Sequence, residues 1–209
     1  MRPFIHVNCA MSADGKIAGS DRKQVRISSD EDKSRVKNLR RKYDAILVGV
    51  GTILSDDPHL TVKGLSYDEN PIRIVLDNNG RTPMDALVVN DQAPTIIVVA
   101  DDCDIIWNNN VEVIRRRRDG PLLDVLEKLA EMGIESILVE GGGETIASFF
   151  REGLVDRYTV FVGGKVIGGR ESPTPVDGDG WVVPEGIELE LRNAEVLGNG
   201  ALLTFSPKQ

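Results

Sequence analysis

The sequence predicts an α/β protein built on a mixed, mostly parallel central sheet flanked by helices. Three nearly continuous apolar runs have the length of strands: AILVGV (45–50), IRIVLD (72–77) and TIIVVA (95–100). Runs of this kind are typical of parallel strands that are covered on both faces. At its end the chain has two strand-like segments joined by Asn199-Gly200, which predict an antiparallel hairpin with a type I′ turn. This hairpin excludes a simple doubly wound fold.

The first part of the chain predicts a strand followed by a helix. FIHVNC (4–9) is a β-rich apolar segment and forms the first expected strand. Ser28 and Glu31 have the spacing of a capping box, in which each side chain satisfies a free backbone N–H at the start of a helix. The helix behind them places three side chains on one face: Val36, Leu39 and Tyr43.

The second half continues the alternation of strands and helices. VEVIR (111–115) is a short strand, and PLLDVLEKLAEMG (121–133) is a helix with Pro near its start and Gly at its stop. A strand at 136–140, a helix from about 144 to 152 and a strand at 157–163 follow. Residues 163–184, rich in Gly and Pro, are expected to form a long surface loop. No repeat or linker divides residues 1–209, so we expect one domain with eight or nine strands.

Composition and charge limit the possible functions. The net charge of −8 argues against nonspecific binding to nucleic acid or anionic membranes, but a small phosphorylated ligand remains possible. No apolar run approaches the roughly 20 residues needed to span a bilayer, and the N-terminus has no signal-peptide pattern. Cys9 and Cys103 match no C-x-x-C pattern, so we expect no disulfide framework and no metal site. A cytoplasmic protein is expected.

VEGGGET (139–145) is the segment most indicative of a binding site. Three glycines between a strand and a helix let a ligand approach the backbone closely, where the first N–H groups of the helix form an anion site. The alternative is a tight turn, which one glycine would normally satisfy, so three favour phosphate binding. The segment matches neither the G-x-G-x-x-G fingerprint nor the Walker A motif. Glu140 either accepts hydrogen bonds from a ligand or caps a loop.

GVGTILSDDPHLTV (49–62) places two acidic residues side by side behind a strand. Asp56 and Asp57 repel each other unless they face water or a compensating partner. Thr52 and Asp56 follow the carboxyl end of a strand, the edge at which α/β sheets bind ligands, so we expect them in one crevice with Glu140. Taken alone, the aspartates also fit a solvated loop.

Five segments resemble, in order, those of the pyrimidine reductases of riboflavin biosynthesis. GTILSDDPHLTVK matches the signature G-[TS]-x-L-x-D-[DN]-P-x-L-[TS]-V-[RK]. The others are MSADGKIA, IRIVLDNNGRTP, LVEGGGET and GLVDRYTVFVGGKVIGG. The resemblance covers nearly the whole chain and implies a fold like that of dihydrofolate reductase. It also implies hydride transfer from NADPH, with NADH as a poorer donor, to C1′ of a ribosylamino pyrimidine phosphate, which yields a ribityl side chain.

The resemblance assigns cofactor contacts along the carboxyl edge of the sheet. It places Thr52 and Asp56 on the cofactor, and the loop Leu76, Asp77, Asn78 and Asn79 near its adenosine half. The pyrophosphate would lie on Gly141, Gly142, Gly143, Glu144 and Thr145, in agreement with the anion site inferred above. The RRRR run (115–118) reads as a solvated strand end, or alternatively as an attraction for the 2′-phosphate.

The resemblance also assigns residues to the substrate, a small phosphorylated pyrimidine. These residues are Arg40, Leu60, Lys63, Glu140 and, near the reacting end, Asp14. Lys63 stands where many members have arginine, so a point charge replaces a bidentate group there. Asp57 is the candidate for proton transfer, because its nearness to Asp56 would raise the pKa of one of the two carboxyl groups.

The order of pathway steps is a further implication of the resemblance. The chain begins at the reductase segment and lacks the H-A-E and P-C-x-x-C motifs of the zinc deaminase found in bifunctional members. It is therefore similar to the standalone archaeal and fungal type, which reduces the diamino pyrimidine before deamination and is commonly a homodimer. The alternatives are a reductase of the deaminated pyrimidine, a dihydrofolate reductase and a noncatalytic NADP-binding domain.

Overall fold

The structure is a computed structural model that describes residues 1–23, 25–108, 110–182 and 186–208. The strands in this part of the chain form one nine-stranded sheet of order β5-β4-β3-β2-β6-β1-β7-β9-β8. All neighbours from β5 to β7 are parallel, whereas β9 runs antiparallel to β7 and to β8. The predicted mixed, mostly parallel sheet with a C-terminal hairpin is confirmed. The strands are β1 (Phe4–Ser12), β2 (Ala45–Gly49), β3 (Ile72–Leu76), β4 (Thr95–Ala100), β5 (Val111–Arg116), β6 (Ser136–Gly141), β7 (Arg157–Gly163), β8 (Leu189–Leu197) and β9 (Gly200–Pro207).

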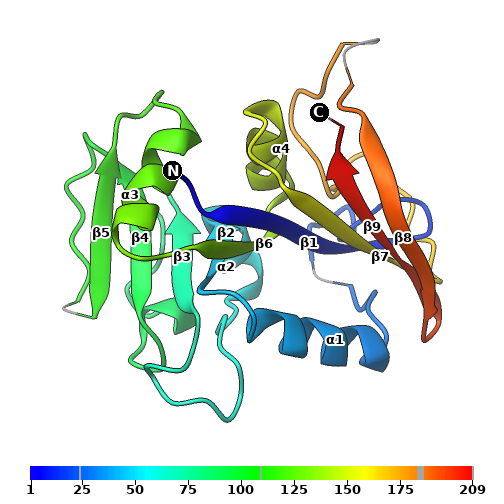
Figure 1. Cartoon of the computed structure of the whole chain (residues 1–209), viewed down its shortest axis with the longest axis horizontal. Coiled ribbons are helices and arrows are strands. Elements are labelled where there is room, and N and C mark those ends of the chain that lie inside the picture. The colour runs from blue at the N-terminus through cyan, green and yellow to red at the C-terminus, as the bar shows by residue number, and fades with distance from the viewer. Residues whose placement is uncertain (24, 109, 183–185, 209) are drawn as a thin grey trace.

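Four α-helices of the described chain cover the two faces of the sheet: α1 (Asp30–Arg40), α2 (Val50–Asp56), α3 (Leu122–Glu131) and α4 (Gly143–Arg151). Helices α3 and α4 share a core with one face, to which Leu126, Val139 and Phe149 contribute. Helix α2 and the 3₁₀ turn η1 (Leu87–Val89) pack on the other face around Val48 and Ile53. Figure 1 shows α3 and α4 at the top of the view and α1 and α2 below. None of the helices in the described ranges is long and apolar enough to cross a membrane.

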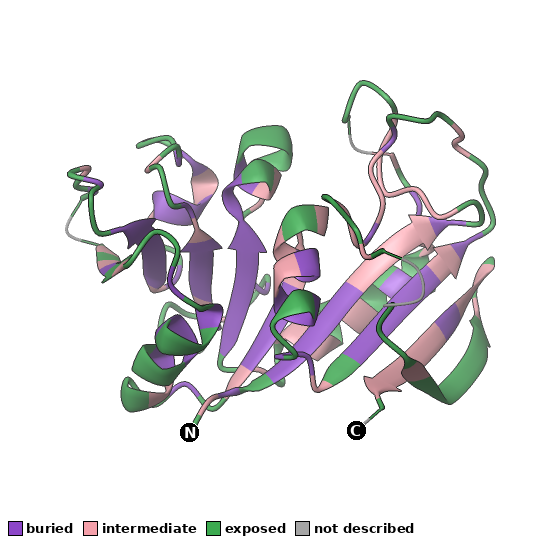
Figure 2. Ribbon diagram, turned by 90° about the horizontal axis from the view of Figure 1, so that it is seen from above, coloured by how far each residue is buried: buried purple, intermediate pink, exposed green. Residues whose placement is uncertain are grey.

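Burial follows this layering. Strands β2 and β4 are buried along their whole length, whereas β8 is exposed except at its ends (Figure 2). Leu191 and Val196 of β8 expose 53% and 86% of their surface. One edge of the sheet is therefore an exposed strand that carries apolar side chains.

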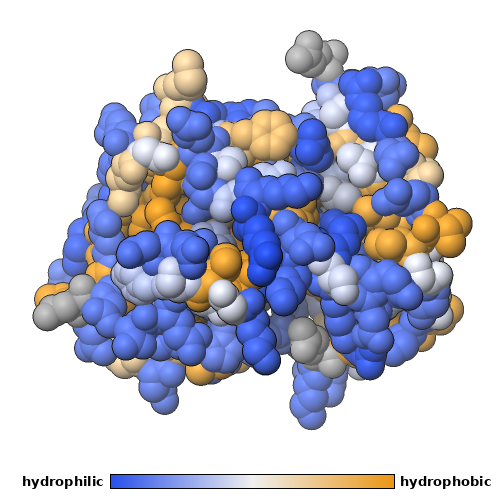
Figure 3. All heavy atoms as spheres, turned by 60° about the horizontal axis from the view of Figure 1, so that its bottom comes forward, coloured by the Kyte–Doolittle hydropathy of each residue, from blue (hydrophilic) through white to orange (hydrophobic). Residues whose placement is uncertain are grey.

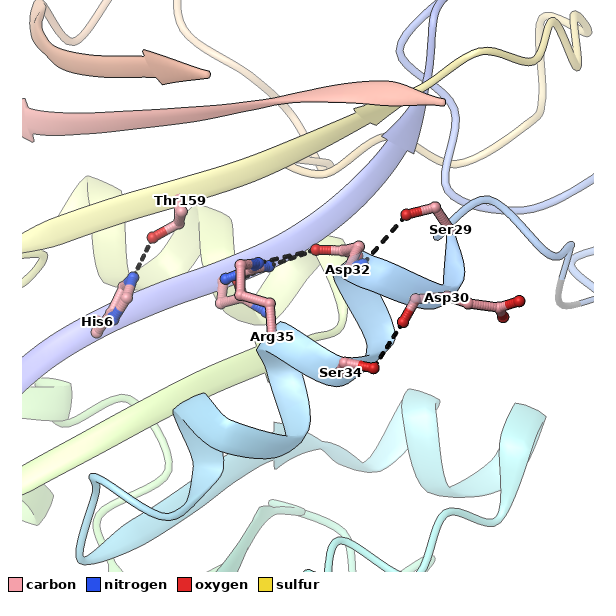
Figure 4. Close-up of polar contacts among 8 residues, drawn as sticks. His6, Ser29, Asp30, Asp32, Ser34, Arg35 and Thr159 are labelled. Carbon is pink, nitrogen blue, oxygen red and sulfur yellow. Dashed lines mark hydrogen bonds and ion pairs between the residues drawn. The ribbon is translucent and has the colours of Figure 1, made fainter. Parts of the chain in front are cut away.

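Helix α1 begins one residue later than the predicted capping box implies. Ser29, not Ser28, is the N-cap, and its Oγ accepts a hydrogen bond from the backbone N–H of Asp32 at 3.1 Å. Figure 4 shows this cap and the ion pair of Asp32 with Arg35 behind it. Two adjacent serines offer equivalent caps, so the sequence does not distinguish them. The helix also ends at Arg40, before Tyr43.

The C-terminal hairpin turns one residue earlier than predicted. Leu197 pairs with Gly200, so the two turn residues are Gly198 and Asn199. Only the first has a positive φ, 57°, which fits a type II′ turn rather than type I′. Gly200 belongs to β9, where a Cβ would collide with the backbone oxygen of Val162. Glycine is therefore required at position 200 for the close packing of β9 against β7 and not for the turn.

A helix that the sequence did not predict follows β2. Val50 starts α2 instead of ending the strand, and Asp57 closes the helix in the left-handed region at φ 39°. Aspartate tolerates that conformation better than most residues. The stretch that reads as a loop is thus one short helix followed by a turn.

A buried polar network lies between α1 and the sheet. The ring of His6 contacts the hydroxyls of Tyr43 and Thr159, and its side chain is almost fully buried. Figure 4 shows the contact with Thr159. Burial, with the positive charges of Arg157 and Arg35, lowers the pKa of His6 from 6.5 to about 3. The folded protein therefore keeps this imidazole neutral at physiological pH.

Because of His6, we expect the free energy of unfolding to decrease as the pH is lowered. The unfolded chain binds a proton below about pH 6.5 while the folded protein does not, so protonation favours unfolding between there and about pH 3. When the pH is lowered from about 7.5 to about 5, the free energy of unfolding of the wild type should decrease by about 2 kcal/mol more than that of His6→Gln, which has no titratable ring. Urea denaturation at the two pH values measures this. Equal losses in both proteins would contradict it.

Candidate functional site

Two connected cavities lie at the carboxyl edge of the sheet. The first, of about 620 Å³, is bounded by α1 and is called the α1 lobe; the second, of about 690 Å³, reaches the end of β3 and is called the β3 lobe. Both are lined by Ile17, Thr52, Asp56, Gly142 and Gly143. These shared residues place one continuous cleft where α/β sheets bind ligands.

The glycine turn forms the floor between the lobes. Gly142 is the N-cap of α4 at φ 73°, a conformation that favours glycine. A Cβ on Gly143 would lie 2.6 Å from the backbone oxygen of Thr174 and 2.7 Å from Cβ of Asp177. Two of the three positions thus require glycine for conformational or steric reasons that do not depend on a ligand. The turn still directs the first N–H groups of α4 toward the cleft, as an anion site requires.

Of the predicted surface loop 163–184, residues 183 and 184 lie outside the described part of the chain, and residues 163–182 do more than cover the surface. The backbone N–H of Asp177 donates to the oxygen of Gly143 at 3.2 Å, and Ile17 N donates to Pro173 O at 3.0 Å. Pro175 lines the α1 lobe, and Pro173 and Asp177 line the β3 lobe. This segment therefore forms a wall of the cleft.

Helix α2 brings two predicted residues to the cleft. Thr52 and Asp56 are four positions apart, so they share one helical face, and both line both lobes. A Cβ on Gly141 would lie 3.3 Å from Oγ1 of Thr52, which shows how closely α2 approaches the glycine turn. Glu140, which the sequence places in one crevice with Thr52 and Asp56, lines the α1 lobe together with them.

Glu140 is the extra residue of a β-bulge. Leu47 of β2 pairs with Val139, but the next residue, Val48, pairs with Gly141. Bulges redirect side chains and are frequent beside functional sites. The bulge leaves Glu140 at the wall of the α1 lobe, where its side chain is 8% exposed.

Arg40 of α1 forms a bidentate ion pair with this glutamate. Its Nε lies 2.9 Å and 3.1 Å from the two carboxylate oxygens, and its Nη2 lies 2.5 Å from Oε2. Burial alone would lower the pKa of Arg40, but the charge and hydrogen bonds of Glu140 raise it. Arg40 and Glu140, both assigned to the substrate, are thus brought together in the α1 lobe.

The β3 lobe contains most of the predicted cofactor residues. Leu76, Asn78 and Asn79 line it, as do Glu144 and Thr145 of α4. Asp77 does not, because its side chain is turned into the protein and is 1% exposed. Its Oδ2 accepts hydrogen bonds from the backbone N and the Oγ1 of Thr82, each at 2.7 Å. This geometry gives Asp77 the role of holding the turn after β3.

Four other predicted residues do not line either lobe. Leu60 is 2% exposed in the core beside α2, and Lys63 is exposed. Asp57 is exposed, and its Oδ1 accepts a hydrogen bond from the backbone N–H of Leu87 at 2.8 Å. This partner favours a structural role for Asp57 rather than proton transfer.

Asp14, the fourth, joins two loops. Its carboxylate accepts hydrogen bonds from Ser12 Oγ at 2.6 Å, Ile167 N at 3.0 Å and Gly168 N at 2.7 Å. These three bonds lower the pKa of Asp14 to about 2. Asp14 therefore ties the turn after β1 to the segment that walls the cleft.

Three cations of the α1 lobe are not among the residues predicted from the sequence. They are Arg26, Lys33 and Lys37. A signal was present in the sequence, because Lys33, Val36, Lys37 and Arg40 have the i, i+3, i+4, i+7 spacing of one helical face. Among the residues that the structure describes, no group of three or more His, Cys, Asp or Glu could hold a metal ion.

Solved structures of reductases share this fold. The deaminase/5-amino-6-(5-phosphoribosylamino)uracil reductase of Thermotoga maritima matches with a TM-score of 0.82 at 28% identity, over 99% of this chain and 57% of that one. The riboflavin biosynthesis reductase Rib7 of Saccharomyces cerevisiae matches with a TM-score of 0.75 at 23% identity, over 99% and 90%. The second likeness supports the fold alone.

Sequence comparison gives the family. The chain is 40% identical over 218 residues to the 2,5-diamino-6-ribosylamino-4(3H)-pyrimidinone 5′-phosphate reductase of Methanothermobacter thermautotrophicus, covering 100% of each. It is 38% identical over 221 residues to the protein of the same name from Archaeoglobus fulgidus, covering 98% of each. The family model described as the RibD C-terminal domain matches residues 3–203. The chain therefore belongs to the RibD C-terminal domain family, the pyrimidine reductases of riboflavin biosynthesis.

Proposed function

We propose that this protein reduces 2,5-diamino-6-ribosylamino-4(3H)-pyrimidinone 5′-phosphate to its ribitylamino form with NADPH. The observation that carries the proposal is the two-lobed cleft, whose lobes meet at Thr52, Asp56 and the glycine turn. A reductase must hold a cofactor and a substrate side by side, and two connected lobes provide those two places. The full-length similarity to two archaeal proteins of that name supports this substrate.

The β3 lobe is the proposed cofactor site. The glycine turn and the start of α4 offer backbone N–H groups for a pyrophosphate, and Asn78 and Asn79 offer amide groups beside the end of β3. A nicotinamide cofactor bound there supplies the hydride. Thr52 and Asp56, at the junction of the lobes, orient the reacting end and separate it from bulk water.

NADPH is the proposed donor rather than NADH because of the arginines in the β3 lobe. Arg22, Arg81 and Arg116 line it, and none of the three forms an ion pair with a carboxylate within the described residues. Of the RRRR run, Arg118 instead pairs with Asp102 at 2.6 Å, outside the lobe. A 2′-phosphate would therefore meet guanidinium groups whose charge no carboxylate of the described residues neutralises, although Arg116 also donates hydrogen bonds to the backbone oxygens of Arg117 and Gly120.

The α1 lobe is the proposed substrate site. The carboxylate of Glu140 is fixed by Arg40, and its remaining lone pairs accept hydrogen bonds from amino groups on the pyrimidine ring. Fixing the ring orients the side chain at the junction of the lobes. The acceptor is C1′ of the ring-opened Schiff base, which takes the hydride, while a proton on the adjacent nitrogen completes the amine.

Two properties outside the site belong to the same proposal. We place the protein in the cytoplasm as a homodimer. The exposed edge strand β8, with Leu191 and Val196, supports self-association, since exposed apolar edges favour pairing with another chain. Cys9 and Cys103, both free thiols, fit a reducing compartment.

The proposed reaction is tested by following NADPH absorbance with the diamino substrate and with its deaminated counterpart. We expect turnover of the diamino compound. Preference for the deaminated compound would reverse the proposed order of reduction and deamination. Binding of NADPH without reduction of either compound would overturn the catalytic proposal.

The proposed role of Arg116 predicts a change in cofactor preference. Arg116→Ala should raise the KM for NADPH about tenfold and leave the KM for NADH unchanged, since NADH lacks the 2′-phosphate. Arg115→Ala, one residue away but outside the lobe, is the matched control. Equal effects on both cofactors would refute the assignment.

The packing of Gly143 predicts a loss of cofactor affinity on substitution. Gly143→Ala would force the 172–177 segment away from α4, and we expect the Kd for NADPH to rise about tenfold. Gly186→Ala is the control, because a Cβ there meets nothing within 4 Å and the residue lines neither lobe. Fluorescence titration of folded protein measures the affinity. An unchanged Kd for Gly143→Ala would show that this wall does not hold the cofactor.

A further inference from the structure

One face of α1 is a row of polar groups over the α1 lobe. Lys33, Lys37 and Arg40 lie on this face with Val36 among them, and all four line the lobe. With a rise of about 1.5 Å per residue, Lys37 lies about one turn and Lys33 about two turns from Arg40 along the helix axis. The row therefore extends away from the Arg40–Glu140 pair toward the start of α1.

The charges of the row are unevenly compensated. Arg40 is neutralised by Glu140, and Arg26 pairs with Asp30 at 2.7 Å. Lys33 lies 3.9 Å from the same Asp30, a long and exposed contact that compensates it weakly. Lys37 forms no ion pair in the described part of the chain. Two lysine ammonium groups thus remain available to a ligand.

The charge of the side chains that line this lobe is opposite in sign to the net charge of the whole chain. The protein has a net charge of −8, yet the α1 lobe has four cationic side chains against the carboxylates of Asp56 and Glu140. Figure 3, which brings the α1 side forward, shows strongly hydrophilic residues gathered across the middle of this face. A local excess of cations in an acidic protein attracts an anion to that place.

We propose that Lys33 and Lys37 bind the 5′-phosphate of the substrate. This rests on the proposed function and replaces Lys63, which lies outside the lobe. A ring held at Glu140 places the phosphate at the far end of a five-carbon side chain, and the row of lysines begins one turn from that pair. Two ammonium groups match a phosphomonoester dianion through charge-assisted hydrogen bonds.

The binding test uses ribose 5-phosphate as the probe, with ribose as the uncharged control. Titrations by NMR are run with saturating NADP⁺, so that the 2′-phosphate site is filled. Ribose 5-phosphate should bind more tightly than ribose, and Lys33→Ala and Lys37→Ala should each weaken it about tenfold. Lys42→Ala removes the same charge just beyond α1, outside the lobe, and should leave binding unchanged. Equal losses in all three variants, or none, would overturn the proposal.

The kinetic test separates this site from the proposed reaction. With the phosphorylated pyrimidine, Lys37→Ala should raise KM about tenfold with little change in kcat, and with the dephosphorylated compound its KM should match wild type. If Lys37→Ala reduces both compounds and its KM differs from wild type by the same factor for each, the proposed phosphate site is refuted and the proposed reaction stands. If ribose 5-phosphate binds in a way that depends on the two lysines but neither pyrimidine is reduced, the proposed phosphate site stands and the proposed reaction is refuted.

Discussion

The ion pair between Arg40 and Glu140 is the interaction on which the arrangement of the cleft depends. The bulge in β6 directs a carboxylate that is only 8% exposed into the end of the sheet. An uncompensated charge at that burial would destabilise the fold by about 3–5 kcal/mol, so the bulge requires a cation. Arg40 supplies it from an element 100 residues away in the chain. A local irregularity of one strand thereby determines where α1 must end.

The other end of α1 is held by a second set of polar contacts. Asp32 is fully buried and pairs with Arg35 at 2.8 Å (Figure 4). Arg35 donates in turn to Asn8 of β1 at 2.8 Å. The cap by Ser29 completes this anchor. Because α1 is attached at both ends, its rotation about its own axis is fixed. The same rotation that buries Asp32 turns Lys33 and Lys37 toward the cleft.

The sequence predicts the sheet well and the site only in part, for physical reasons. Long apolar runs such as TIIVVA leave few alternatives to a buried strand, and a glycine turn after a strand indicates a ligand-binding edge. The motif containing Leu60 and Lys63 predicts one contact surface, but in the fold Leu60 lies in the core and Lys63 is exposed to solvent. The bulge at Glu140 depends on the pairing of β2 with β6, which local sequence does not encode.

The two lobes are held by different kinds of interaction, and this bears on how their specificities relate. The α1 lobe is shaped by side-chain ion pairs, whereas the β3 lobe is shaped by close backbone packing of Gly143 against residues 174–177. Charge substitutions at one lobe therefore leave the walls of the other in place. The exception is the shared boundary, since Thr52 and Asp56 of α2 line both lobes, as do Gly142 and Gly143 of the glycine turn. Coupling between cofactor and substrate can therefore pass through α2, the helix absent from the sequence prediction, and through the glycine turn that it closely approaches.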